Sequence, residues 1–201
     1  MDFDKQIFDF VYEFALRDAT LQNAYTGSLD LLRKNVAAKH TVRGYIDSIF
    51  NWEADEDSFW KTAQLVEESF SAFLPQQQPR FTFGNTQKLI NMSAKYMFIT
   101  CYQNEGLRSA FESCHCPMDS IMVNTVIDEL ERAYDNSFSS DERKEIRGFM
   151  FRGWKGYLRS SWSRMESSDV NQYKFYQRAV QFLSGREGIS PLEYDFLMWG
   201  R

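Results

Sequence analysis

Apolar residues recur at intervals of three and four along nearly the whole chain, and the strict alternation typical of a half-buried strand is almost absent. We trace about eight helical segments in this way and find no internal repeat. The pattern predicts an all-α fold, one bundle-like domain over residues 1–201, with the proline-containing loop at 74–83 as the only candidate internal boundary. One predicted inward stripe near the start consists of Phe3, Ile7, Phe10, Val11 and Phe14.

Capping residues, prolines and glycines mark the expected helix boundaries. We expect a helix over 28–38 and another that begins at Thr41. A capping box opens at Ser139 and predicts a long helix to about residue 163, with a kink at Gly153 or Gly156.

The chain is rich in aromatic residues, which make up 16% of it, and most of the rings fall on inward helical stripes. We therefore expect a bulky aromatic core. The formal net charge of −5 gives no global attraction to nucleic acid or to an anionic membrane. The chain has no apolar run of membrane-spanning length and no secretion-signal pattern at its start. With its three cysteines expected as thiols, we predict a cytoplasmic protein without membrane contact.

The most informative polar residues lie in the middle of the chain. Lys88, Asn91 and Lys95 share one face of a helix that is otherwise apolar. Two lysines in such a helix need an anion nearby, either a carboxylate such as Asp119 or a bound phosphate or carboxylate ligand; alternatively they extend into solvent. For Asp119 the alternative role is a helix cap, and for His115 a structural one. We predict a ligand-binding site formed by Lys88, Asn91, Lys95, His115 and Asp119.

Cys114, His115 and Cys116 are adjacent in sequence, whereas structural zinc ligands are spaced by gaps of about two to four residues. We therefore expect no metal site, and adjacent side chains also rarely face one another as a nucleophilic pair. The chain contains no Walker lysine loop, dinucleotide-binding glycine fingerprint, Gly-x-Ser-x-Gly elbow or His-Glu-x-x-His pair. We expect no cofactor, and whether the protein is an enzyme stays open.

A glycine shortly before a helical lysine, with Pro-x-Asp-Ser further on at a helix start, resembles the helix-hairpin-helix DNA glycosylases. The residues concerned are Gly84, Lys88 and the segment 117–120. The resemblance implies a DNA-processing enzyme in which Lys88 is the nucleophile that attacks the sugar carbon and Asp119 is the assisting carboxylate. It covers a small part of the chain, and 80–84 departs from the Leu-Pro-Gly-Val-Gly hairpin of that family.

Residues 143–164 form a second candidate surface, in which Trp154, Tyr157 and Trp162 are interleaved with basic residues. Basic side chains neutralise phosphates and aromatic rings stack on bases, so the segment is suited to nucleic acid; the alternative is a solvated face of a core helix. The glycines of the segment predict close packing of another helix against its backbone. The predicted nucleic-acid contacts are Arg147, Arg152, Lys155 and Arg159.

These patterns predict a ligand-binding or interaction protein whose partner is a small anionic molecule or a protein, with the site on the stripe of Lys88, Asn91 and Lys95. The alternative hypothesis is a DNA-processing enzyme of the glycosylase type. A third hypothesis is an assembly factor in which exposed aromatic residues form an oligomer interface.

Overall fold

The computed structural model describes residues 3–199, with side chains from Gln6 onward, and all regular structure in that range is helical. This confirms the predicted all-α fold, and eight of the eleven α-helices in the range have nine or more residues. None of the described helices is long and apolar enough to cross a membrane. The elements are α1 (Phe3–Thr20), α2 (Leu29–Arg33), α3 (Val36–Phe50), α4 (Glu56–Phe73), α5 (Phe83–Cys101), α6 (Glu105–Ser109), α7 (Ser120–Asn136), α8 (Ser140–Phe149), α9 (Trp154–Arg159), the 3-10 turns η1 (Trp162–Arg164) and η2 (Ser167–Asp169), α10 (Val170–Glu187) and α11 (Pro191–Trp199).

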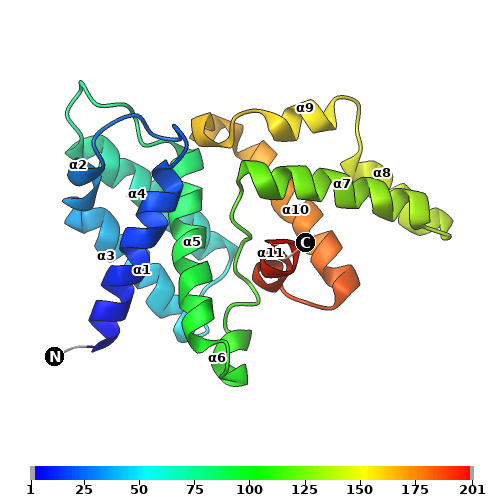
Figure 1. Ribbon diagram of the computed structural model, residues 1–201, viewed down its shortest axis with the longest axis horizontal. Helices are drawn as coiled ribbons and strands as arrows, with labels where there is room; N and C mark the ends of the chain where they lie inside the picture. Colours follow the sequence, from blue (N-terminus) through cyan, green and yellow to red (C-terminus); the bar gives the residue numbers. More distant parts are fainter. Residues whose placement is uncertain (1–2, 200–201) are drawn as a thin grey trace.

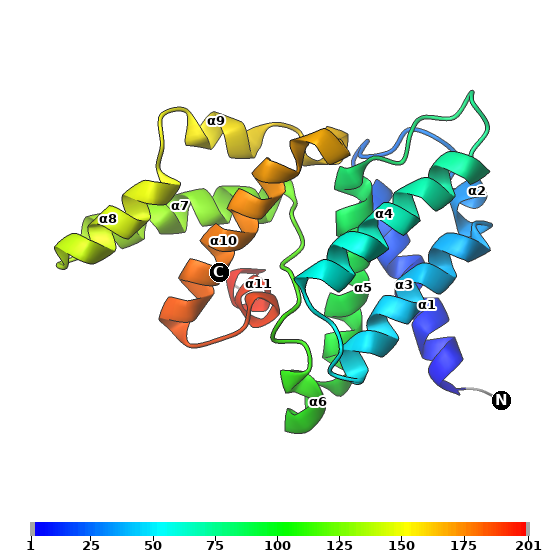
Figure 2. The same cartoon turned by 180° about the vertical axis from the view of Figure 1, so that it is seen from behind.

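Two groups of helices meet at α5 (Figures 1 and 2). In the first group, α5 lies between α1 on one side and α3 and α4 on the other. In the second group, α10 and α11 pack against α7, and the extended segment 114–119 runs up to α7 between the two groups (Figure 1). The loop at 74–82 connects α4 to α5, two helices that contact each other.

The helix α5 is buried over nearly its whole length, as its apolar composition predicts. Its N-terminus is fixed by Thr82, whose Oγ1 accepts a hydrogen bond from the backbone N–H of Asn85 at 3.2 Å. The same hydroxyl donates to the carbonyl oxygen of Ser163 at 2.7 Å, so the cap also holds the chain around η1 against the start of α5.

The predicted inward stripe of α1 lies partly on the wrong face of the helix. Val11 is buried, but Phe10 is 63% exposed and Phe14 is 42% exposed, and the side chain of Phe3 lies outside the described residues. The buried face of α1 contains small residues, which let the helix approach α5 closely and leave the second apolar stripe outside. This buried face consists of Phe8, Val11, Tyr12, Ala15, Leu16 and Ala19.

The segment predicted as a helix over 28–38 is instead the short α2 followed by the start of α3. Asn35 caps α3, because its Oδ1 accepts a hydrogen bond from the N–H of Ala38 at 3.1 Å. Thr41 is therefore inside α3, where its hydroxyl donates to the carbonyl oxygen of Ala37 instead of capping a helix.

The long helix predicted from Ser139 to residue 163 is also wrong, because the chain breaks between α8 and α9. The break contains Gly153, whose φ of +84° suits glycine and interrupts a right-handed helix. A Cβ added at Gly148, Gly153 or Gly156 would meet no atom within 4 Å, so the expected close packing against these glycines is wrong as well.

The close approach occurs at Gly84 instead. Its N–H donates to the carbonyl oxygen of Met165 at 2.9 Å, and a Cβ there would lie 1.8 Å from the carbonyl oxygen of Trp162. The bare backbone of Gly84 therefore lets η1 pack on the first turn of α5.

We expect Gly84→Ala to destabilise the protein by about 2 kcal/mol or more, because the added methyl group overlaps backbone that has to move. Gly148→Ala is the matched control, and it should stabilise the protein by about 0.5–1 kcal/mol because alanine is the better helix former. Urea unfolding of the two variants measures both effects. Equal effects of the two substitutions would contradict the proposed packing of η1 on α5.

Candidate ligand-binding site

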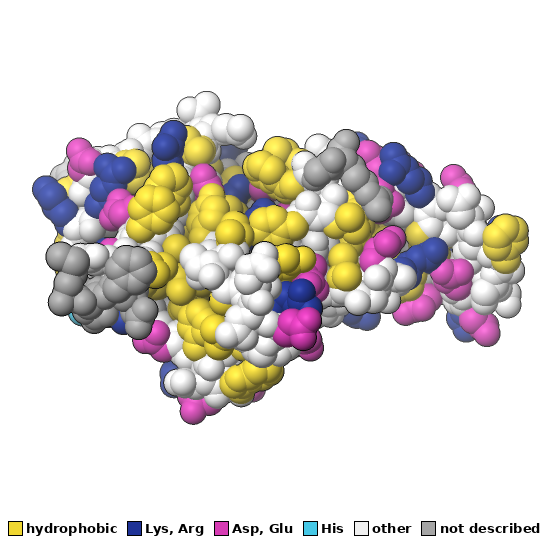
Figure 3. All heavy atoms as spheres, turned by 60° about the horizontal axis from the view of Figure 1, so that its bottom comes forward, with side chains coloured by type: hydrophobic (Ala, Val, Ile, Leu, Met, Phe, Trp, Pro, Cys, Tyr) yellow, Lys and Arg dark blue, Asp and Glu magenta, His cyan; other side chains and the backbone are white. Residues whose placement is uncertain are grey.

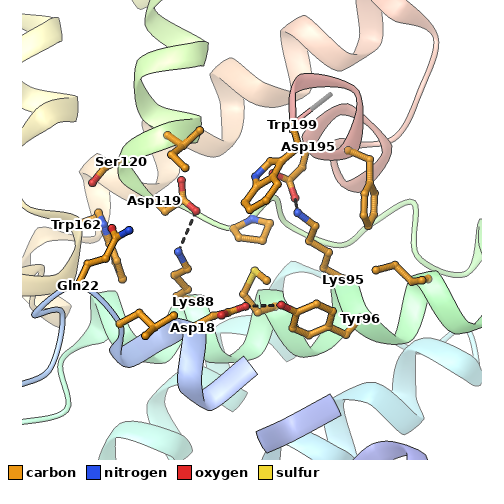
Figure 4. A pocket seen from close by; sticks show the side chains of 16 residues that line it. Asp18, Gln22, Lys88, Lys95, Tyr96, Asp119, Ser120, Trp162, Asp195 and Trp199 are labelled. Carbon is orange, nitrogen blue, oxygen red and sulfur yellow. Dashed lines mark hydrogen bonds and ion pairs between the residues drawn. The ribbon is translucent and has the colours of Figure 1, made fainter. Parts of the chain in front are cut away.

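A cavity of about 360 Å³ opens between α5, the start of α7 and α11. Lys88 and Lys95 project into it side by side from α5, toward Asp119 and Asp195 on the far side (Figure 4). The described residues that line it are Asp18, Leu21, Gln22, Lys88, Met92, Lys95, Tyr96, Ile99, Pro117, Asp119, Ser120, Ile121, Trp162, Asp195, Phe196 and Trp199.

The first ion pair of the cavity joins Lys88 to Asp119, with 2.9 Å between Lys88 Nζ and Asp119 Oδ2. Asp119 is also the N-cap of α7, since its Oδ1 accepts a hydrogen bond from the N–H of Met122 at 2.9 Å. The carboxylate is therefore both the counter-ion of Lys88 and a helix cap. Lys88 Nζ also lies 4.8 Å from the ring centroid of Trp162, within the range of a cation–π contact.

The second ion pair joins Lys95 to Asp195, a partner that the sequence analysis missed. Lys95 Nζ lies 4.7 Å from the ring centroid of Phe196 and 4.9 Å from that of Trp199. Burial raises the pKa of Asp195 above its usual value, and the nearby Lys95 ammonium opposes that rise. The available sequence signal was an acid directly before the apolar run 196–199, since a charged residue in apolar surroundings needs a counter-ion.

Both lysines are buried, with exposed fractions of 9% for Lys88 and 5% for Lys95, so the alternative in which they extend into solvent does not hold. An ammonium group has three N–H donors, and the described contacts of each lysine include one carboxylate. Each ammonium group thus has more donors than its one carboxylate contact takes up, and it also faces aromatic rings of the lining. Asp18, the third carboxylate of the lining, accepts a hydrogen bond from the hydroxyl of Tyr96.

Asn91 and His115 lie outside this cavity, although the sequence analysis grouped them with the lysines. Both contact the hydroxyl of Tyr173 on α10: Asn91 Nδ2 donates to it at 2.7 Å, and His115 Nδ1 lies 3.0 Å from it. The ring of His115 is packed against that of Phe59, with 4.4 Å between centroids. Of the five predicted site residues, the structure thus brings Lys88, Lys95 and Asp119 together and places Asn91 and His115 in a separate buried polar network.

The residues Cys114, His115 and Cys116 do not converge. Cys116 Sγ lies 3.3 Å from the hydroxyl oxygen of Tyr176, whereas His115 faces Tyr173. Burial raises the pKa of the thiols of Cys114 and Cys116 above the ordinary value. In residues 6–199, no group of three or more His, Cys, Asp or Glu is arranged to hold a metal ion.

The predicted nucleic-acid contacts are divided between α8, α9 and the turn that joins them. Arg147 Nε donates to the hydroxyl of Tyr134 at 2.9 Å, and Arg159 Nε donates to Asn124 Oδ1 at 3.0 Å. Lys155 is paired with Glu131, and Arg152 is exposed in the turn. Three of the four basic groups therefore already contact α7, and nucleic-acid binding by this segment stays a prediction.

Comparisons with protein-family models, with curated proteins and with solved structures find no match to this chain. Its function therefore has to be inferred from the geometry of the cavity and of the surface around it.

The pKa of His115 is lowered to about 4, mainly because burial disfavours its charged form. The unfolded chain binds this proton with an ordinary pKa of about 6.5, so acid favours unfolding. We expect His115 to remove about 3 kcal/mol from the free energy of unfolding as the pH falls from about 6.5 to 4.

Urea unfolding between neutral pH and pH 4 measures this loss for the wild type and for His115→Gln, which lacks the titrating ring. His40→Gln is the matched control, because His40 is exposed on α3. The free energy of unfolding should depend less on pH in His115→Gln than in the wild type. In His40→Gln its pH dependence should be unchanged. An unchanged slope in His115→Gln would show that this histidine is not buried in its neutral form.

Proposed function

We propose that this protein binds a small organic anion with an apolar body in the cavity between α5, α7 and α11. The observation that carries the proposal is the pair of buried ammonium groups, Lys88 and Lys95, that project from one helix face into the same cavity. The rings of Trp162, Phe196 and Trp199 supply apolar walls beside them. A concave, mostly apolar site with a few convergent polar groups is typical of small-molecule binding.

The energetics of the two ion pairs support a role beyond stability. Desolvation of a buried pair offsets most of its Coulomb attraction, and apolar residues of similar volume are often as stabilising. Two such pairs in the most buried helix of the chain are therefore weak stabilisers of the fold. They are well suited to hold ammonium donors in place at a cavity wall until a ligand arrives.

The carboxylates of the cavity compete with an anionic ligand for the lysines. The lining carries two lysines and three aspartates, so an anion has to share Lys88 with Asp119 or Lys95 with Asp195. Removing one of these negative charges should therefore strengthen anion binding, whereas removing an ammonium group should weaken it.

Benzoate is a suitable probe because it combines a carboxylate with a planar apolar ring. We expect Lys88→Met to weaken benzoate binding at least tenfold, since a charge-assisted hydrogen bond is lost, on the order of 1.5–3 kcal/mol. Asp119→Asn keeps the acceptor that caps α7 and should tighten binding several-fold. Isothermal titration calorimetry measures both affinities.

Benzylamine is the control ligand, because it has the same ring and the opposite charge. Benzylamine should bind more tightly to Lys88→Met and more weakly to Asp119→Asn. Weaker benzoate binding in Asp119→Asn, or unchanged binding in Lys88→Met, would contradict an anion site at Lys88.

A second candidate function is a DNA-processing enzyme of the glycosylase type, and the contact between Lys88 and Asp119 is the observation that favours it. If Lys88 is a nucleophile, its amine condenses with the aldehyde of an abasic site, water leaves, and borohydride reduces the resulting imine to a stable adduct. We expect such an adduct to form with the wild type and with Lys144→Ala, an exposed control, and to be lost in Lys88→Ala. A wild type without an adduct contradicts this second function.

We also propose a cytoplasmic location, which the three free cysteines, Cys101, Cys114 and Cys116, support.

A further inference from the structure

An apolar groove lies beside the cavity, on the face between α1 and α5. It encloses about 520 Å³ and has two lining residues in common with the cavity, Tyr96 and Ile99. Hydrophobic side chains crowd the face of the molecule shown in Figure 3. The described residues that line the groove are Gln6, Ile7, Phe10, Val11, Phe14, Tyr96, Ile99 and Thr100.

The groove is built from large apolar side chains that the core leaves uncovered. Phe10 and Phe14 are the exposed rings among the described side chains of α1, and Ile99 on α5 is 49% exposed. The rings of Phe10 and Phe14 lie 4.4 Å apart between centroids, and Phe14 contacts Tyr96 edge-on at 6.4 Å. These exposed apolar side chains surround a hollow that is suited to an apolar ligand group.

The helix α5 joins the groove to the charged cavity. Lys95 and Ile99 are four residues apart on α5, which corresponds to about 6 Å along the helix axis. The Lys95 ammonium therefore lies at one end of a continuous surface, and the rings of α1 lie at the other. A ligand that extends from Lys95 along Tyr96 and Ile99 passes from an ammonium group to a mostly apolar groove.

We propose that the ligand is a single-chain amphiphile, with a carboxylate head on Lys95 and an acyl tail in the groove of Phe10, Phe14 and Ile99; this rests on the proposed function and names its ligand class. The chemistry of the groove favours an acyl chain over a peptide segment. A docked peptide backbone needs hydrogen-bond partners, and the polar side chains among the lining residues are Gln6, Thr100 and Tyr96, whose hydroxyl already donates to Asp18. An acyl chain has no such groups to satisfy.

Calorimetric titration with hexanoate, octanoate and decanoate, below their micellar concentrations, tests this proposal. Each added methylene that enters the groove should tighten binding about fourfold. Decanol is the neutral analogue of the longest acid. It should bind more weakly than decanoate to the wild type, whereas the two should bind to Lys95→Met with equal affinity. Affinity that does not depend on chain length overturns the proposal.

The variant Phe10→Ser with Phe14→Ser removes the groove rings without touching the core, because both rings are exposed. It should lose at least tenfold in decanoate affinity and keep its benzoate affinity. Phe138→Ser is the matched control, because Phe138 is fully exposed between α7 and α8, and it should change neither affinity.

The benzoate titration separates the two levels of the proposal. If benzoate binds but the affinities of hexanoate, octanoate and decanoate are equal, the anion site is supported and the acyl groove is overturned. Absence of binding by benzoate and decanoate alike overturns both. Sedimentation that shows a dimer broken by Phe10→Ser with Phe14→Ser would assign the groove to a second copy of the chain and also overturn the acyl ligand.

Discussion

The burial of two ammonium groups in α5, a helix that is buried over nearly its whole length, is the constraint on which the rest of the structure depends. Lys88 and Lys95 cannot stay charged inside the molecule without carboxylates, and α5 itself carries none. Asp119 comes from the start of α7 and Asp195 from α11, so both helices have to lie against the same face of α5. The two ion pairs thus fix the face of α5 on which α7 and α11 pack, although they add little net stability.

The same constraint creates the cavity. Side chains that pair across the space between α5, α7 and α11 hold these helices apart, and aromatic residues of η1 and α11 fill only part of the gap. Gly84 contributes indirectly, because its bare backbone lets η1 approach α5 and brings Trp162 over Lys88. This packing lines the cavity with both charged side chains and aromatic rings. The exposed rings of α1 extend the apolar part of the surface into the groove.

The sequence predicts the fold class, and it names Asp119 as one possible counter-ion of the α5 lysines, because these depend on local periodicity and on the need of a buried charge for a counter-ion. Asp195 was missed because its contact with Lys95 joins residues a hundred positions apart, and no local pattern encodes that distance. The phase of α1 was misjudged because the helix has two apolar faces, and only tertiary packing decides which one meets α5. His115 was grouped with the lysines by nearness in sequence, whereas the extended segment 114–119 turns its ring toward Tyr173.

The most direct test of the central claim is an NMR spectrum of the ammonium groups of isotope-labelled lysine, recorded before and after the addition of benzoate. Burial and ion pairing slow proton exchange, so Lys88 and Lys95 should give two resolved signals that the exposed lysines do not give. Both signals should shift when benzoate is added. A spectrum without slowly exchanging ammonium signals, or with signals that benzoate leaves unmoved, would contradict an anion site built on these two lysines.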